Sequence, residues 1–416
     1  MTYVKRIVDD ELSSRLEALG GVVIEGPKAC GKTVTAQHIA ASEVRLDVDT
    51  AARQAAGLEP ALVLEGPTPR LIDEWQLEPT IWNHIRRAID DRQKPGQFIL
   101  TGSAVPADDI TRHSGAGRLS RLRMRPLSLF EKGRSSGRIS LSELLQGTEQ
   151  GSPEARLVVP EIAEEIALGG WPGFLQMGRD QALGSVRDYL EEIRRTDVSA
   201  ISGTRRDPIK VGQLLHSIGR NVATHASTAT LARDAGGADG PLKDDTAHEY
   251  LDALRRLMII EDQPAWGTHL RTTHTLRKAP KLHFVDPSLA VAALSAAPER
   301  LLQDLNLLGF LFESLVVRDL RIYAQAAGAD VLQYRDSSGL EVDAVIDGID
   351  GRWAAFEVKL GFGQVDEAAD NLNRFVNRID TSRCGPPAAL GVIIGSGYGF
   401  VREDGIQIIP IGALGP

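Results

Sequence analysis

The stretch GVVIEGPKACGKTVTAQHIA occupies residues 21–40 and decides the fold of the first part of the chain. An apolar run precedes the pattern GxxxxGK(S/T), and a helix candidate follows it. Glycines let backbone N–H groups converge on phosphate oxygens, and the N-terminus of the following helix adds a positive dipole. We therefore predict a strand, a phosphate-binding loop and a helix, with the loop formed by Gly26, Pro27, Lys28, Ala29, Cys30, Gly31, Lys32 and Thr33.

Each side chain of this loop has an expected task. Lys32 is predicted to reach the β and γ phosphates, and the Thr33 hydroxyl suits Mg²⁺, a hard ion that prefers oxygen. We expect Lys28 to be solvated and the Cys30 thiol to be a small filler rather than a catalyst. The alternative is a glycine-rich turn that contains Lys and Thr by chance, and the flanking strand and helix argue against it.

A second polar element lies at the ends of two later apolar runs. Asp73 and Glu74 follow one run, and Thr101 ends the next. We expect Asp73 to hold Mg²⁺ through water and Glu74 to orient and polarise the attacking water. An acidic pair alone is more often a solvated turn, but the preceding phosphate loop favours the functional interpretation. Thr101 is predicted to sense the γ phosphate, with an ordinary turn after a strand as the alternative.

An arginine-rich segment follows these strands. Between residues 112 and 138 the single acid is Glu131, and the cations are Arg112, Arg118, Arg121, Arg123, Arg125, Lys132, Arg134 and Arg138. Phosphoryl transfer often uses an arginine that neutralises charge in the transition state. Arg118 and Arg121 are our catalytic candidates for this role, and ordinary surface charge is the alternative. If either acts on a neighbouring subunit, the active form is a homo-oligomer assembled through this domain.

Composition limits the class of protein. The 416 residues are 42% hydrophobic and 25% charged, which is typical of globular proteins and excludes disordered or fibrous chains. With 47 Lys and Arg against 56 Asp and Glu, the net charge of −9 provides no global attraction to nucleic acid. Two distant cysteines exclude a disulfide scaffold and a cysteine-rich zinc site, so a cytoplasmic location is expected. We found no secretion signal and no apolar run long enough to span a membrane.

The pattern of apolar residues predicts a mosaic of α/β and helical domains. Residues 1–140 alternate short apolar runs with helices, which indicates a mainly parallel sheet. We assign residues 141–205 to a helical linker region and 206–300 to a largely helical, winged-helix-like domain with a small strand pair. Residues 301–416 read as helix, three strands, helix and a last strand. This order predicts a C-terminal α/β domain.

The middle region contains a short helix, a turn and a longer helix, as in a helix-turn-helix. The second helix would present Lys243, Thr246 and His248 near its start, where groove contacts with DNA are made. A packing module without a nucleic-acid role is the alternative, and the acids at 244 and 245 favour it. No histidine pair has metal-ligand spacing, and we expect Asp286 to be structural.

The C-terminal strands carry a second group of charged residues. Asp343 is followed 14 residues later by Glu357, and Lys359 lies two positions further, on the same face of its strand. This spacing, together with the order of elements, resembles the PD-(D/E)XK nuclease pattern and predicts a restriction-endonuclease-like fold. Asp343 and Glu357 would then bind a divalent metal ion, with Glu313 as an added ligand, and Lys359 would steady the attacking water. A salt-bridged surface hairpin is the alternative.

Taken together, these motifs resemble the prokaryotic AAA-type P-loop ATPases that carry a C-terminal domain of unknown function. The resemblance rests on GPKACGKT (26–33), LIDE (71–74), TGS (101–103), RPLSLFE (125–131) and GGWP (169–172). It implies that Lys32 and Thr33 bind ATP and Mg²⁺, that Asp73 and Glu74 form the second acidic motif, and that Thr101 is at the sensor position.

These features predict an ATP-hydrolysing switch or motor, coupled through the middle region to a nuclease-like module that handles DNA. Hydrolysis would reposition the other domains by changing contacts to the γ phosphate. The alternatives are an ATP-gated DNA-binding regulator and a scaffold for a protein partner in which the nuclease-like module is inactive. ATP and Mg²⁺ are the expected cofactors, DNA is the expected partner, and no membrane association is expected.

Overall fold

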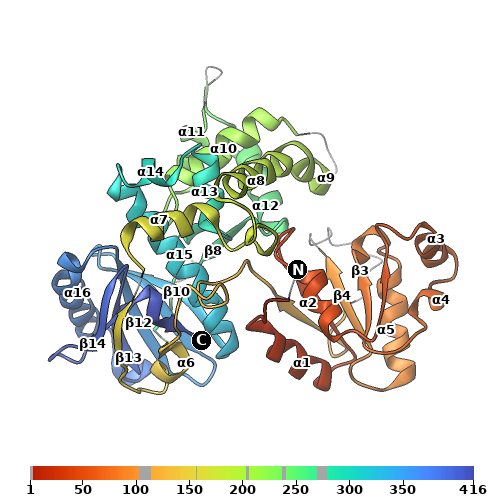
Figure 1. The fold of residues 1–416 in the computed structure, drawn as a ribbon, viewed down its shortest axis with the longest axis horizontal. Coiled ribbons are helices and arrows are strands. Elements are labelled where there is room, and N and C mark those ends of the chain that lie inside the picture. Colours follow the sequence, from red (N-terminus) through yellow and green to blue (C-terminus); the bar gives the residue numbers. More distant parts are fainter. Residues whose placement is uncertain (1–2, 103–113, 156, 203–205, 237–239, 269–278) are drawn as a thin grey trace.

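The computed structural model describes the chain except residues 1–2, 103–113, 156, 203–205, 237–239 and 269–278. Figure 1 shows an N-terminal α/β domain on one side, a C-terminal sheet on the other, and a helical region above the latter. This is the mixed α/β architecture that the sequence predicts. Among the described residues, no helix combines the length and apolar character needed to cross a membrane.

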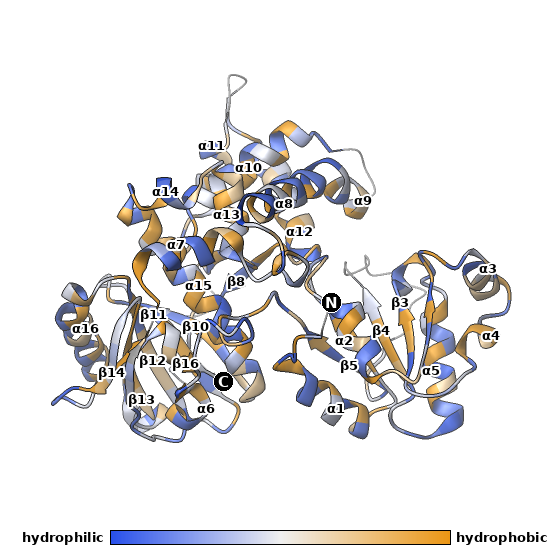
Figure 2. Ribbon diagram, viewed as in Figure 1, coloured by the Kyte–Doolittle hydropathy of each residue, from blue (hydrophilic) through white to orange (hydrophobic). Residues whose placement is uncertain are grey.

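The N-terminal domain is a five-stranded parallel sheet in the order β2-β3-β4-β1-β5. Its strands are short, and the three inner strands are mostly buried, as expected of a parallel sheet between helices. In Figure 2 the inner strands of this sheet carry mostly apolar residues. The elements are α1 (Val8–Ala18), β1 (Gly21–Glu25), α2 (Lys32–Ile39), β2 (Ser42–Arg45), α3 (Thr50–Leu58), α4 (Pro60–Leu64), β3 (Arg70–Asp73), α5 (Ile81–Arg92), β4 (Phe98–Gly102) and β5 (Leu119–Arg123).

The chain then enters the C-terminal sheet before it reaches the helical region. Strand β6 (Ile139–Ser140) pairs with β16 (Leu414–Gly415), and β7 (Ser152–Ala155) pairs with β14 (Gly397–Val401). The short helix α6 (Leu141–Leu144) lies between them. This differs from the predicted helical linker over residues 141–205, because the start of that segment joins strands more than 200 residues away in sequence.

The helical region runs from residue 159 to residue 301 and contains the predicted strand pair, which forms an antiparallel hairpin. Several helices start where the sequence provides a cap: the Asp207 carboxylate accepts a hydrogen bond from the backbone N–H of Ile209, and Ser227 caps the next helix in the same way. The elements are α7 (Val159–Leu168), α8 (Arg179–Glu192), α9 (Val198–Ser202), α10 (Pro208–Arg220), α11 (Thr228–Asp234), α12 (Asp244–Arg256), β8 (Ile260–Gln263), β9 (Lys281–Phe284), α13 (Pro287–Ala293) and α14 (Pro298–Leu301).

The C-terminal domain is a seven-stranded mixed sheet in the order β10-β11-β12-β13-β15-β14-β7. The predicted order of helix, three strands, helix and strand is confirmed, and three further strands follow it. The elements beyond those already given are α15 (Leu305–Ala326), β10 (Ala329–Arg335), β11 (Glu341–Gly348), β12 (Trp353–Lys359), α16 (Val365–Arg378), α17 (Thr381–Cys384), β13 (Ala389–Ile394) and β15 (Gln407–Pro410).

The buried apolar residues of the described parts of the chain form four clusters of unequal size. One continuous core joins the helical region to the C-terminal domain and runs along α15, most of whose residues are buried. A second cluster lies between the C-terminal sheet and α16, whose buried residues recur every three or four positions. The sheet of the N-terminal domain is packed into two clusters of its own. The helical and C-terminal parts therefore share one core, whereas the sheet of the N-terminal domain has its own.

The GGWP segment joins these parts. Gly170 lies against the backbone of Leu127, and a Cβ at Gly170 would be only 2.1 Å from the carbonyl oxygen of Leu127. The Gly170 N–H donates to Asp286 at 2.9 Å, and the Trp171 indole donates to Ser288 at 3.0 Å. Asp286 is fully buried and also pairs with Arg318. Its structural role is therefore confirmed.

Candidate functional site

The predicted phosphate loop links β1 to α2. Gly31 has a φ of 104°, a left-handed conformation that favours glycine, and Lys32 is the first residue of α2. The Lys32 ammonium donates to the carbonyl oxygens of Gly26 and Pro27, each at 2.8 Å. Cys30 is buried, and its sulfur contacts the carbonyl of Met124, in agreement with a filler role. The loop thus has the conformation needed to present its N–H groups to an anion.

Asp73, at the end of β3, forms hydrogen bonds both with the phosphate loop and with the end of the neighbouring strand β4. It ends β3 opposite Thr101 of β4, and its carboxylate accepts hydrogen bonds from the Thr101 hydroxyl and, at 3.0 Å, from the Thr33 hydroxyl. The sequence places these three residues up to 68 positions apart, and parallel pairing brings them to one edge of the sheet. A carboxylate and a hydroxyl beside a phosphate loop fit Mg²⁺, because both supply hard oxygen ligands.

Glu74 follows directly and has an unusual backbone conformation. Its φ of 54° is left-handed, which is uncommon for a residue other than glycine and often marks functional sites. Burial raises the pKa of the Glu74 carboxyl, and the amide of Gln76 contacts it. A carboxyl with a raised pKa beside the phosphate loop suits a group that accepts a proton from water.

Both the N-terminal domain and the helical region line the cavity in front of the loop. It has a volume of about 830 Å³, and its walls include Lys32, Thr33 and Glu74 on one side and Pro172, Gly173 and Asp197 on the other. Asp197 ends a π-helical turn, Ile193–Asp197, and π-helical turns are frequent at functional sites. A ligand held by the loop would therefore contact the helical region as well.

Lys28 is exposed to solvent, as predicted, but it also makes an ion pair that the sequence did not predict. Its ammonium lies 2.6 Å from the Asp197 carboxylate, and the Tyr189 hydroxyl donates to its carbonyl oxygen at 3.2 Å. The Lys28 side chain remains 48% exposed, whereas the Asp197 side chain is buried. This ion pair joins the phosphate loop to the helical region, a contact that the loop motif alone does not predict.

Most cations of the arginine-rich segment that the structure describes are neutralised within the chain, whereas Arg112 lies outside the described residues. Arg118 pairs with Asp90 at 2.6 Å, and Arg121 pairs with Glu25. Further ion pairs join Arg123 and Arg125 to Glu261, Lys132 to Glu165, and Arg134 to Glu161 and Glu165. Neither catalytic candidate, Arg118 or Arg121, is among the residues that line the cavity at the phosphate loop. A role in a neighbouring subunit stays a prediction.

Glu261 is the acidic centre of this interface. It lies on β8, and its carboxylate accepts from Arg123 at 2.8 Å, from Arg125 at 3.0 Å and from Arg321 of α15 at 3.0 Å. Although burial alone would raise the pKa of Glu261, the three guanidinium groups hold it well below its ordinary value. Glu261 therefore stays ionised and ties the N-terminal domain to the hairpin and to α15.

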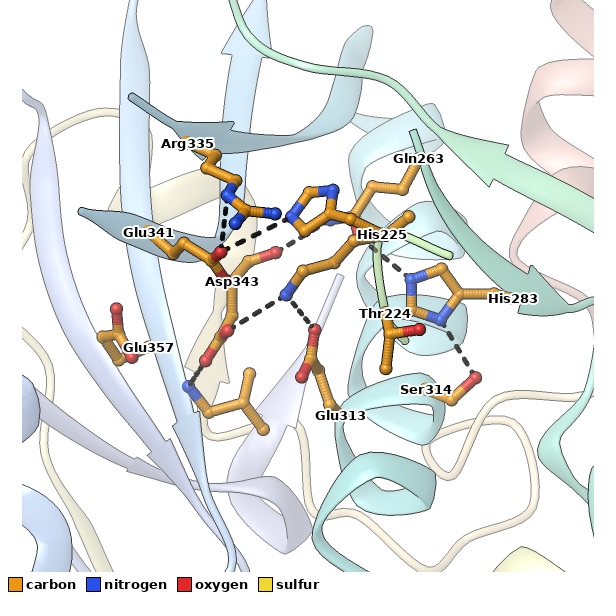
Figure 3. A network of polar contacts seen from close by, with 12 residues as sticks. Thr224, His225, Gln263, His283, Glu313, Ser314, Arg335, Glu341, Asp343 and Glu357 are labelled. Atoms are coloured by element: carbon orange, nitrogen blue, oxygen red, sulfur yellow. Dashed lines mark hydrogen bonds and ion pairs between the residues drawn. The ribbon is translucent and has the colours of Figure 1, made fainter. Parts of the chain in front are cut away.

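The charged residues predicted in the C-terminal domain lie together. The Lys359 ammonium is 2.6 Å from Glu357 and 3.3 Å from Asp343, and the backbone N–H of Val358 donates to Asp343 at 2.9 Å. Figure 3 shows the Glu313 side chain on α15 converging with Asp343. We call Glu313, Asp343, Glu357 and their lysine partners the carboxylate centre.

Sequence reasoning missed one member of this centre. The Lys281 ammonium lies between two carboxylates, 2.6 Å from Glu313 and 3.2 Å from Asp343, and its side chain is only 4% exposed. Lys281 comes from β9, about 60 residues before Asp343, and belongs to no motif. The signal in the sequence was a lysine at the first position of the apolar stretch KLHF, which forms a strand whose four residues are all buried.

The electrostatics follow from burial and these contacts. Burial raises the pKa of Glu313 to about 7, helped by the nearby charge of Asp343, and the same two causes raise the pKa of Glu357. Burial alone would raise the pKa of Asp343, but Lys281 and Lys359 hold it well below its ordinary value. Glu313 and Asp343 in turn raise the pKa of Lys281 against the effect of burial. Among the three carboxylates of the centre, Asp343 is therefore the most strongly ionised.

The predicted metal ligands lie together, but lysine side chains pair with them. We expected Glu313, Asp343 and Glu357 to hold a divalent ion, but the two ammonium groups lie between them. In the part of the chain that the structure describes, no three Asp, Glu, His or Cys side chains are grouped as a metal site. A cavity of about 980 Å³ borders the centre and is lined by Lys281, Glu313 and Asp343 together with His225, Arg335 and Lys359.

Comparison with known families divides the chain in three. Residues 20–132 match the family described as an AAA domain. Residues 159–300 and 308–414 match two families, DUF8612 and DUF4143, each described as a domain of unknown function. The N-terminal part is therefore a P-loop ATPase domain of the AAA type, as its motifs predict.

Individual relatives are distant. The uncharacterised proteins Rv2008c of Mycobacterium tuberculosis and Mb2031c of Mycobacterium bovis are each 23% identical over 344 residues, covering 81% of this chain and 70% of theirs. A Walker-type ATPase of Pyrococcus abyssi is 14% identical with a TM-score of 0.41, covering 68% of this chain and 94% of its own. A signal transduction ATPase of Pyrococcus horikoshii is 14% identical with a TM-score of 0.22, covering 78% and 48%.

Proposed function

We propose that this chain is an ATP-hydrolysing switch whose nucleotide state controls how the N-terminal domain sits on the rest of the molecule. The observation that carries the proposal is the convergence of Thr33, Asp73 and Thr101 beside a cavity that Thr33 and residues of the helical region line. Thr33 and Asp73 would hold Mg²⁺, which supplies positive charge to the phosphates. Lys32 would bind the terminal phosphates, and Glu74 would accept a proton from the attacking water.

Two contacts support coupling between the domains. Lys28 of the loop is bound to Asp197 of the helical region, so a phosphate in the loop would compete with Asp197 for the same ammonium group. The β8–β9 hairpin connects the remaining parts, because Glu261 on β8 binds Arg123 and Arg125 of the N-terminal domain while Lys281 on β9 enters the carboxylate centre. A shift of the ATPase domain would therefore be transmitted to the C-terminal domain.

The direct test is steady-state ATP hydrolysis with Mg²⁺. We expect E74Q to lower the rate about 10²- to 10⁴-fold while ATP still binds, since it removes the proton acceptor. K32A is expected to weaken ATP binding as well. The matched controls are E17Q and K94A, which change exposed residues of the same domain and should leave the rate unchanged. Wild-type rates in both E74Q and K32A would contradict the proposal.

We further propose that the regulated activity concerns DNA. The support is the exposed N-terminus of α12, where Lys243 and His248 face solvent, and the proximity of Asp343, Glu357 and Lys359, which agrees with a nuclease-like module. If α12 binds DNA, the logarithm of the affinity should fall linearly with the logarithm of the salt concentration. K243A should reduce both the affinity and the slope of this dependence. An affinity that is independent of salt and of Lys243 would argue against this role.

A regulator or scaffold with an inactive C-terminal module is the second candidate. The specific observation in its favour is the ion pairing of Lys281 with Asp343 and Glu313. Incubation with linear and circular DNA in Mg²⁺ or Mn²⁺ separates the two candidates. Cleavage that D343N and K359M abolish supports a nuclease, and no cleavage under any condition supports the regulator.

A further inference from the structure

We propose that Lys281 is the resident cation of the carboxylate centre and occupies the place that a divalent metal ion would need between Glu313 and Asp343. Its ammonium contacts both carboxylates, at 2.6 Å and 3.2 Å, from a position that is almost completely buried. The proposal concerns the wild-type chain and does not depend on ATP hydrolysis.

Both carboxylate oxygens of Asp343 and of Glu357 are already engaged. In Asp343, Oδ1 contacts Lys281, and Oδ2 accepts from the backbone of Val358 and contacts Lys359. In Glu357, Oε2 contacts Lys359 at 2.6 Å, and Oε1 accepts from the Asn371 amide at 2.8 Å. Because Mg²⁺ and Mn²⁺ require several oxygen ligands, an ammonium group must leave before such an ion can bind.

Lys281 is the lysine that can leave. Lys359 lies on β12, two residues from Glu357, and moves with the carboxylates that it contacts. Lys281 comes from the β8–β9 hairpin of the helical region, which contacts the C-terminal domain through the Glu261–Arg321 ion pair and, nearer to Lys281, through neutral groups. The Gln263 amide donates to the carbonyl oxygens of Asp343 and Leu332 at 2.9 and 3.0 Å, and the His283 ring contacts Ser314 at 3.1 Å. These contacts, which Figure 3 shows in part, belong to the hairpin and not to β12, so Lys281 reaches the carboxylates from a separate element.

The balance of charge favours a divalent ion once Lys281 is removed. The centre combines three carboxylates with two ammonium groups, so loss of Lys281 leaves three carboxylates with Lys359 alone. A buried excess of negative charge is costly without compensation. A hard divalent cation that binds oxygen would supply the missing charge, and it would use the carboxylates that Lys281 releases.

The test is Mn²⁺ binding to the full-length, nucleotide-free protein, followed by electron paramagnetic resonance. We expect K281M to bind one Mn²⁺ at least about tenfold more tightly than wild type, and the double variant K281M/D343N to return to the wild-type affinity. K210M changes an exposed lysine of the same region and should bind as wild type does. A folded K281M with no gain in affinity would overturn the proposal.

A second comparison avoids the risk that K281M fails to fold. If Lys281 holds the cation position, E313Q in the wild-type background should leave Mn²⁺ affinity unchanged, because Glu313 binds an ammonium group and not the metal. If the wild-type centre is itself a metal site, E313Q should weaken Mn²⁺ binding about tenfold or more, and that result would overturn the proposal. Circular dichroism establishes that the variants compared are folded.

Discussion

The phosphate-loop site and the carboxylate centre contain similar residues, yet their charges are used differently. Each combines lysine with buried acids and lies where two parts of the molecule meet. In the loop, Lys32 contacts only carbonyl oxygens and Asp73 accepts from two hydroxyls, so neither charge is neutralised by an opposite one in the contacts described. In the carboxylate centre, acids and lysines are paired with one another. The first arrangement suits an external charged ligand, and the second stabilises the fold.

The sharpest way to break this comparison is to neutralise one aspartate in each region. D343N removes the carboxylate that both lysines contact, and loss of one partner of a buried ion pair is expected to cost about 3 to 5 kcal/mol of stability. D73N changes only the acceptor of two hydroxyl hydrogen bonds, and we expect a cost of about 1 kcal/mol. Urea denaturation measures both. Equal costs would show that the two regions do not differ in this way.

A substitution in the β8–β9 hairpin should change the stability by an intermediate amount. E261Q keeps the shape of the side chain but removes the charge that three arginines share, and we expect a loss of about 2 kcal/mol. The control E249Q breaks an exposed ion pair with Arg206 and should change stability by less than about 0.5 kcal/mol. Thermal unfolding distinguishes them. A stability of E261Q equal to that of E249Q would mean that this interface does not hold the domains together.

A pH dependence of stability tests the carboxylate centre without any substitution. Because the folded pKa of Glu313, about 7, is above its ordinary value of 4.5, the folded state holds a proton that the unfolded state releases between these values. Stability should therefore fall as pH rises through this range, by up to about 1.4 kcal/mol per pH unit for one group. E313Q should reduce the slope, and the raised pKa of Glu357 should preserve part of it. An unchanged slope in E313Q would contradict the assignment.

The sequence predicts what depends on neighbouring residues in the chain. The loop from Gly26 to Thr33 is one contiguous motif, and the face shared by Glu357 and Lys359 follows from the two-residue period of a strand. Asp343 could be predicted to join them because a short turn connects adjacent antiparallel strands. These parts of the fold and of the candidate site follow from local rules.

Contacts between distant segments could not be predicted in this way. The position of Lys281 depends on how the β8–β9 hairpin docks on α15, and the pairing of β7 with β14 joins residues more than 240 positions apart. The arginine-rich segment seemed to be a basic patch because its partners, such as Glu261, lie elsewhere in the sequence. Motifs identify the residues that are able to take part in chemistry. Tertiary packing decides which of their charges remain available to a ligand.

The most direct test of the central claim is the affinity of the wild type and K32A for a fluorescent ATP analogue in the presence of Mg²⁺. The account predicts that K32A binds about 10- to 100-fold more weakly, because Lys32 supplies a charged hydrogen bond to the phosphates, whereas K94A binds as the wild type does. Equal affinities of K32A and wild type would contradict the assignment of the Gly26–Thr33 loop as the nucleotide site.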